Sequence, residues 1–132
     1  MGPGDAERVT AAADLFDGPP RPDALTRFLA DPGHHLFIAY LDDNPVGFVS
    51  GVEVTHPDKG TEMFLYELGV DSGHRHHGIG SALVEKLADL AKEKGCHGMW
   101  VLVDDENAAA AATYRRAHGD VESQPLMFSW RF

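Results

Sequence analysis

One stretch of the sequence constrains the fold more than any other, because residues 62–103 have the pattern of a strand, a helix and a second strand in direct succession. The run at 62–70 (EMFLYELGV) is mostly apolar. From Gly78 to Lys94 the apolar side chains recur at helical spacing, and a second apolar run follows at 97–103 (HGMWVLV). Two strands of one sheet that are joined through a helix are parallel and form a right-handed crossover. We therefore expect a parallel strand pair with a helix packed against it.

The same patterns predict the other elements of the chain. Apolar residues at helical spacing indicate further helices, and apolar runs bounded by Gly, Pro, Asn and Asp indicate further strands. The resulting order of elements is typical of a mixed α/β layer fold. These further elements are helices at 5–16, 22–30 and 107–118, strands at 35–41, 46–54 and 126–132, and a tight turn at 123–125.

Composition and charge limit the classes of partner. The chain has 132 residues, the size of a single domain, so residues 1–132 are treated as one domain. A net charge of −10 disfavours nucleic acid, and no apolar run is long enough to predict a membrane span. Residues 1–70 hold twelve acidic and four basic side chains, which favours a cationic partner, although solubility alone would also explain this excess. One cysteine, Cys96, rules out an internal disulfide framework, and the cytoplasm is the expected location.

The turn before the long helix carries a distinctive pattern of glycines. It contains Arg75, Gly78 and Gly80 in the spacing R-x-x-G-x-G. A glycine-bearing turn that enters a helix points free backbone N–H groups toward one place, at the positive end of the helix dipole, and such a place binds phosphate. The sequence lacks the Lys-Ser/Thr of a Walker loop and the G-x-G-x-x-G of a dinucleotide fold.

These residues resemble the acyl-CoA-binding motif of the GNAT superfamily of N-acyltransferases. The resemblance rests on a strand that ends at 68–70 (LGV), on residues 75–83 (RHHGIGSAL), and on Asn107 with Tyr114 seven residues later. It implies a mainly antiparallel mixed sheet with one splayed parallel strand pair and helices on both faces. Within the superfamily the chain is most similar to the short aminoglycoside 3-N-acetyltransferases of the gentamicin-resistance type. That finer resemblance lies in residues 12–17 (AADLFD), 64–70 and 127–132.

The resemblance implies acetyl-CoA as the co-substrate and Tyr114 as the acid that protonates the departing thiolate. The alternative for Tyr114 is core packing with a satisfied hydroxyl. The five alanines at 108–112 would let their helix approach the thiol arm of the co-substrate, and the alternative explanation, with which this is compatible, is high helix propensity. The residues expected to bind acetyl-CoA are Leu68, Gly69, Val70, Arg75, His76, His77, Gly78, Ile79, Gly80, Ser81, Asn107, Ala110 and Tyr114.

An acceptor amine must lose a proton before it attacks a thioester, so either a carboxylate base takes this proton or an acidic site selects and orients the amine. Glu67 and Asp104 are the candidates, and the alternative for Glu67 is a structural salt bridge. Leu102 stands where relatives that acetylate peptide N-termini carry a glutamate, which argues against such substrates. A cationic aminoglycoside would meet several carboxylates, although a solvated acidic loop is an equal explanation for residues 104–106. The expected acceptor-binding residues are Asp104, Asp105, Glu106, Glu67 and Glu53.

Several expectations concern what surrounds the site. No metal is expected, because adjacent His76 and His77 do not easily face one ion. The family's usual first strand is missing before the first helix: either the start has been trimmed, or the sheet lacks this strand and exposes an edge. The resemblance also implies a homodimer. The rival functions are acetylation of a polyamine or another small amine, and acyl-CoA sensing without turnover. Aromatic residues 100, 128 and 130 are expected in the core.

Overall fold

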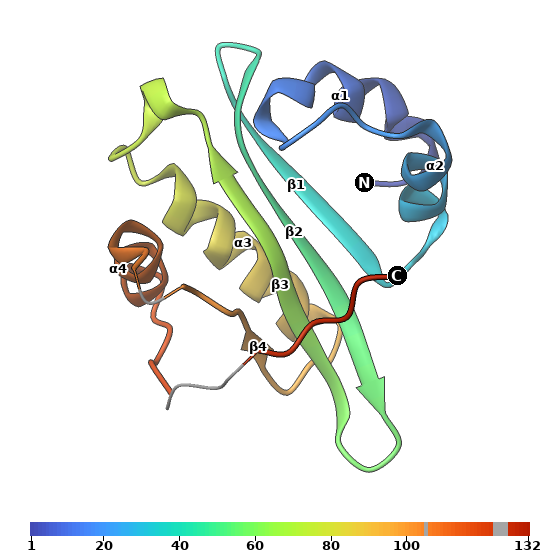
Figure 1. Ribbon diagram of the computed structural model, residues 1–132, viewed down its shortest axis with the longest axis vertical. Helices are drawn as coiled ribbons and strands as arrows, with labels where there is room; N and C mark the ends of the chain where they lie inside the picture. The colour runs from blue at the N-terminus through green and yellow to red at the C-terminus, as the bar shows by residue number, and fades with distance from the viewer. Residues whose placement is uncertain (105, 123–126) are drawn as a thin grey trace.

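The computed structural model describes residues 1–104, 106–122 and 127–132, which form one mixed sheet with helices on both faces (Figure 1). This arrangement confirms the expected fold class. Figure 1 shows α3 behind the sheet with α4 beside it, and α1 and α2 next to β1. The helices are α1 (Ala6–Ala11), α2 (Pro22–Ala30), α3 (Ile79–Glu93) and α4 (Ala108–Arg116), and the strands are β1 (His34–Leu41), β2 (Asn44–His56), β3 (Gly60–Val70) and β4 (Met99–Trp100).

The strands lie in the order β1-β2-β3-β4, with β1 and β4 at the two edges of the sheet. β1, β2 and β3 pair antiparallel, whereas β3 and β4 pair parallel, as the crossover at 62–103 predicts. The ladder between β2 and β3 contains a bulge. Gly51 pairs with Leu65 and the next residue back, Ser50, pairs with Glu67, so that Tyr66 is the extra residue of β3.

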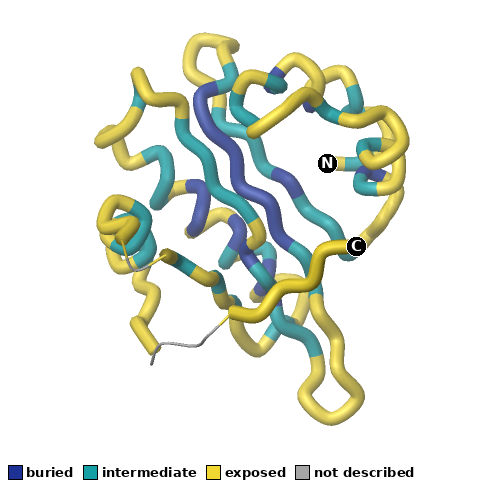
Figure 2. Tube along the Cα trace, viewed as in Figure 1, coloured by how far each residue is buried: buried dark blue, intermediate teal, exposed yellow. Residues whose placement is uncertain are grey.

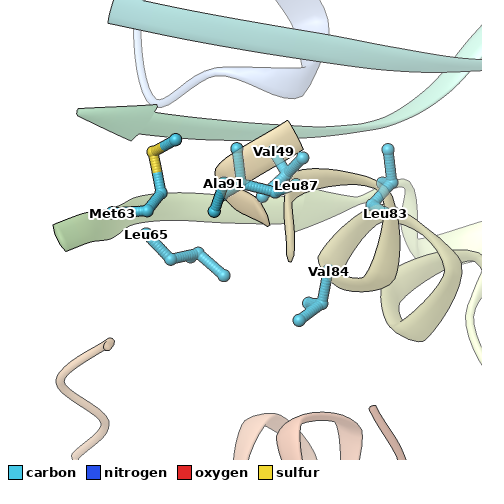
Figure 3. Packing of buried hydrophobic residues seen from close by; sticks show 7 residues of the cluster. All are labelled: Val49, Met63, Leu65, Leu83, Val84, Leu87 and Ala91. Atoms are coloured by element: carbon cyan, nitrogen blue, oxygen red, sulfur yellow. The ribbon is translucent and has the colours of Figure 1, made fainter. Parts of the chain in front are cut away.

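Each face of the sheet has its own apolar core. On the α3 face, Met63 and Leu65 of β3 pack against Leu87 of α3, and Figure 3 shows this packing from close by. Figure 2 shows the buried residues concentrated along the central strands and the α3 side. On the other face, a smaller core joins α1 and α2 to β1 and β2. The buried members of the first core are Val49, Met63, Leu65, Leu83, Val84, Leu87 and Ala91, and those of the second are Val9, Leu29, Leu36 and Phe48.

The expected helix at 5–16 is divided in the structure. It consists of a 3₁₀ turn (Pro3–Asp5), α1, and a second 3₁₀ turn (Ala13–Leu15). Phe16 then takes an extended conformation and packs edge-on against Phe48, with ring centroids 4.7 Å apart. The tighter turn and the extended residue bring the apolar side chains at the end of this segment onto the sheet, which one straight helix would not do.

Two expectations about strands are wrong. Only Met99–Trp100 of the run at 97–103 pairs with β3. Residues 127–132 form no strand, and Phe128 and Trp130 are each 75% exposed rather than buried in the core. An apolar run becomes a strand only where a neighbouring backbone offers a ladder of hydrogen bonds, and no described strand pairs with these residues. The turn at 123–125 and Leu126 lie outside the described residues.

None of the helices in the described ranges is long and apolar enough to cross a membrane.

Candidate functional site

The parallel pair β3/β4 opens immediately after its second residue pair. Met63 pairs with Met99 and Phe64 with Trp100, and beyond this point β3 continues to Val70 with β2 as its one partner among the described strands. No backbone hydrogen bond joins residues 65–70 to residues 101–104. Backbone polar groups that lose a ladder partner must find another one, so this side of β3 is able to accept an extended, amide-bearing ligand. The structure therefore contains the expected splay.

Backbone amides gather beside the splayed end of β3, at the start of α3. Within the described part of the chain, the N–H groups of residues 76–81 donate no hydrogen bond. Gly78 caps α3 with φ of +77°, and Ser81 Oγ donates to the Gly78 carbonyl oxygen at 3.2 Å. Free amides at a helix N-terminus bind anions, because the N–H groups and the helix dipole both favour negative charge. Gly78 is needed here for its left-handed conformation, since a Cβ at this position would meet nothing within 4 Å.

Gly80 lies at a close approach between three elements. A Cβ on Gly80 would lie 3.2 Å from Thr113 Cγ2 in α4 and 3.7 Å from Val70 Cγ2 at the end of β3. The missing side chain therefore lets α4 and the end of β3 approach α3. The motif glycines thus act in two ways, Gly78 through backbone conformation and Gly80 through close packing.

The cationic and imidazole side chains of the turn lie outside this group of amides. Arg75 is exposed, and its Nε donates to the Val70 carbonyl oxygen at 3.5 Å. His74 Nδ1 lies 2.7 Å from Asp71 Oδ2, while His76 and His77 are exposed. No group of three or more His, Cys, Asp or Glu side chains that could hold a metal ion is found among the described residues.

Tyr114 lies in α4 with its ring partly buried against the core of the α3 face. Burial raises the pKa of its hydroxyl, so the group carries its proton at neutral pH. This hydroxyl makes no hydrogen bond to any described residue and is not among the buried unpaired polar atoms of the described residues. Asn107 fixes the start of α4, because its Oδ1 accepts from the Ala110 N–H at 3.0 Å.

Glu67 is half-buried on the face of β3 that points away from α3. Burial raises the pKa of its carboxyl group, and the negative charge of Asp17 and a hydrogen bond with Asp17 raise it further. No basic side chain in the described ranges forms an ion pair with Glu67, so the structural salt bridge considered for it is not observed. Asp17 is an unexpected member of the site, although it lies within the segment 12–17 that carried the finer resemblance.

The remaining acidic candidates do not gather around Glu67. Glu53 lies opposite Met63, on the α3 face of the sheet, and its Oε2 is 2.6 Å from His35 Nε2. Asp104 and Glu106 are exposed in the segment between β4 and α4. Asp105 lies outside the described residues. Of the four acceptor candidates that the structure describes, Glu67 alone lies on β3 beside the splay.

The profile of a family described as the acetyltransferase (GNAT) family matches residues 7–119. The streptothricin acetyltransferase of Streptomyces lavendulae is 32% identical over 87 residues, which cover 65% of this chain and 44% of that enzyme. The chain spans less than half the length of the curated relatives that it matches first.

Solved acetyltransferases share the fold. An aminoglycoside acetyltransferase from an uncultured soil metagenomic sample, in complex with sisomicin, superimposes with a TM-score of 0.91 at 20% identity, covering 100% of this chain and 93% of that chain. The aminoglycoside N-acetyltransferase AAC(6')-Iy, in complex with CoA, superimposes with a TM-score of 0.79 at 20% identity, covering 100% of this chain and 92% of that chain.

Proposed function

Because the chain belongs to the GNAT family of acetyltransferases, we propose that it transfers the acetyl group of acetyl-CoA to an amino group of an aminoglycoside. One observation carries the proposal: the unpaired side of β3 at residues 65–70 runs directly toward the free amides of residues 76–81. An extended chain with amide groups fits the first feature and a phosphate group fits the second. Acetyl-CoA combines both in one molecule.

The residues at the splay fit this co-substrate. The pantetheine arm would take the place of the missing strand beside Leu68 and Val70, and the pyrophosphate would lie against the amides that begin at His76. Gly78 allows the backbone turn that presents those amides. Acetyl-CoA supplies the activated acyl group, while the protein binds and orients it.

Two side chains of the splay suit the proton transfers of a direct reaction. Glu67 takes the proton of the acceptor ammonium, so that the amine nitrogen attacks the thioester carbonyl carbon. The C–N bond forms, the C–S bond breaks, and Tyr114 donates its proton to the departing thiolate. A base works best when its pKa lies near the working pH, so the raised pKa of Glu67 favours it over exposed Asp104. Tyr114 suits its role because burial keeps it protonated.

Charge supports a cationic acceptor. Asp17, Glu67, Asp104 and Glu106 are acidic, and the chain carries a net charge of −10. An aminoglycoside presents several ammonium groups to such a surface. Relatives and structural neighbours named for streptothricin and aminoglycosides support this class of acceptor. The 3-amino group is the proposed position, and the 6'-amino group is the competing one, because a structural neighbour is named for that position.

The test follows the release of free CoA thiol from acetyl-CoA with a panel of amines: gentamicin-like and kanamycin-like aminoglycosides, spermidine, and a peptide with a free N-terminus. We expect rapid release with the aminoglycosides, and NMR of the product then identifies the acetylated nitrogen. Release with spermidine alone would indicate that the acceptor is a polyamine and not an aminoglycoside. Acetyl-CoA binding without release for any amine would favour an acyl-CoA sensor.

A further inference from the structure

Three aromatic side chains form a continuous surface beside the splay. The Phe64 ring stacks on Trp100 with centroids 4.3 Å apart and planes 23° apart, and Tyr66 meets Phe64 edge-on at 5.9 Å. Tyr66 is 67% exposed and Trp100 is 41% exposed. We call Phe64, Tyr66 and Trp100 the aromatic platform. Adjacent exposed aromatic rings are unusual on a protein surface and mark sites of interaction.

The aromatic platform lies on the same face of the sheet as Glu67. Met63 and Leu65 belong to the core of the α3 face, so Phe64 between them points to the opposite face, and Trp100, its direct partner, points the same way. The core on that face joins α1 and α2 to β1 and β2 and includes no residue of β3 or β4. Among the described elements, no helix therefore forms a core with β3 or β4 on this face, whereas Figure 1 shows the C-terminal segment 127–132 crossing in front of the sheet.

The platform also adjoins the reacting end of the proposed site. Phe64 and Trp100 are the last residues that pair before the strands separate, and Glu67 follows one residue after Tyr66 along β3. The expectation that Trp100 belongs to the core therefore fails for a reason that bears on function. Its ring forms a wall of the open face instead of filling the interior.

We propose that the aromatic platform binds a saturated ring of the acceptor, and that it selects amines carried on amino sugars or aminocyclitols over linear polyamines. This inference rests on the proposed acetyl transfer. A six-membered saturated ring presents a flat face of C–H groups that packs on an aromatic ring. Ammonium groups on such a ring also lie within reach of the electron-rich ring faces. A linear polyamine shares the cationic groups but has no ring face.

Charge complements the shape of this surface. Glu67 is on β3 beside the platform, and the side chain of Asp17 is close enough to influence its carboxyl group. The acceptor would therefore contact aromatic rings through its ring face and carboxylates through its amines. Each kind of contact contributes separately, because stacking needs the ring face and ion pairing needs only the charge. Loss of one aromatic ring from such a contact is expected to weaken acceptor binding roughly tenfold.

The experiment measures steady-state kinetics of wild type, Trp100→Leu, Tyr66→Ala and the conservative Trp100→Phe with kanamycin and with spermidine as acceptors. We expect Trp100→Leu and Tyr66→Ala to raise the KM for kanamycin about tenfold, with the KM for acetyl-CoA unchanged. Trp100→Phe should recover most of the loss, because it retains a ring over Phe64. The KM for any spermidine turnover should change much less. Tyr40→Ala is the matched control, since Tyr40 is 48% exposed on β1 at the other edge of the sheet.

A direct readout uses fluorescence. The chain has two tryptophans, so Trp130→Phe leaves Trp100 as the single emitter. Saturable change of its emission on titration with kanamycin in the presence of CoA is expected. An unchanged KM for kanamycin in Trp100→Leu would overturn the inference, as would kanamycin binding, measured by calorimetry, without change in Trp100 emission. If the wild type releases no thiol with any amine, the proposed function itself fails and the inference fails with it. If the wild type acetylates kanamycin and the platform variants have the same KM for it, the proposed role of the aromatic platform is rejected and the proposed function stands.

Discussion

Gly69 offers a sharp test of how β3 is held in place beside the splay. A Cβ at this position would lie 2.6 Å from Phe48 Cε1 and 3.4 Å from the Leu15 carbonyl oxygen. Phe48 is only 2% exposed and is itself fixed by Phe16, so its ring has little freedom to move away. Gly69→Ala therefore forces either the ring or β3 to shift.

The expected size follows from two opposing effects. Overpacking of a filled core costs about 1–3 kcal/mol. Alanine in place of glycine in a strand stabilises the folded state by about 0.5–1 kcal/mol, because less backbone conformational entropy is lost on folding. The overpacking dominates, and Gly69→Ala should reduce the free energy of unfolding by about 1–2 kcal/mol. For a chain of this size, that loss lowers Tm by about 4–8 °C. Because β3 carries the unpaired edge, the KM for acetyl-CoA should rise as well.

Thermal unfolding followed by circular dichroism measures the stability, and thiol release measures the KM. Gly98→Ala is the matched control, since a Cβ at Gly98 would meet nothing within 4 Å. Phe48→Leu removes the ring atom in closest contact. In the Phe48→Leu background, Gly69→Ala should therefore lower the free energy of unfolding by less than it does in the wild type. A Gly69→Ala protein with the Tm of the wild type would refute the packing argument.

Three further predictions concern proton transfer. Tyr114→Phe should lower kcat by about 100-fold or more while calorimetry finds acetyl-CoA binding unchanged, and a normal kcat would exclude Tyr114 from the chemistry. If Glu67 is the base, kcat/KM falls as the pH drops through its pKa, and Glu67→Gln should abolish this acid limb whereas Asp104→Asn should retain it. Asp17 raises the pKa of Glu67, so Asp17→Asn should move the acid limb to lower pH. A limb that stays in place would show that Asp17 does not act on the base.

Local patterns were sufficient for most of the secondary structure. The helix at 22–30 was predicted with the bounds that α2 has, because Pro22 starts it and Asp31-Pro32-Gly33 ends it. The hairpin and the parallel crossover also follow from short-range turn residues and from chain chirality. The strand expected at 126–132 is different, since a strand depends on a neighbour that the segment itself does not contain.

The candidate site also contains features that local sequence predicts and features that depend on contacts between distant segments. The glycine turn before α3 was recognisable because its function depends on backbone conformation within a few residues, as the φ of +77° at Gly78 illustrates. The packing role of Gly80 was not predicted, because the atom that lies closest to its missing side chain belongs to α4, more than thirty residues later in the chain. The aromatic platform was missed because an apolar residue in a strand has the same appearance whether its face is covered or open.

The sequence by itself determined most of the helices and strands, the parallel crossover and the amide-lined turn, because each depends on side-chain periodicity or backbone preference within one segment. Only the tertiary structure decided which way Glu67 points. Strict alternation from Met63 and Leu65 would place Glu67 on the α3 face with them. The bulge at Tyr66 adds one residue, so Leu68 packs against the α3 core and Glu67 turns to the opposite face, toward Asp17. That one-residue shift arises from the pairing of β3 with β2, which no pattern within β3 alone reveals.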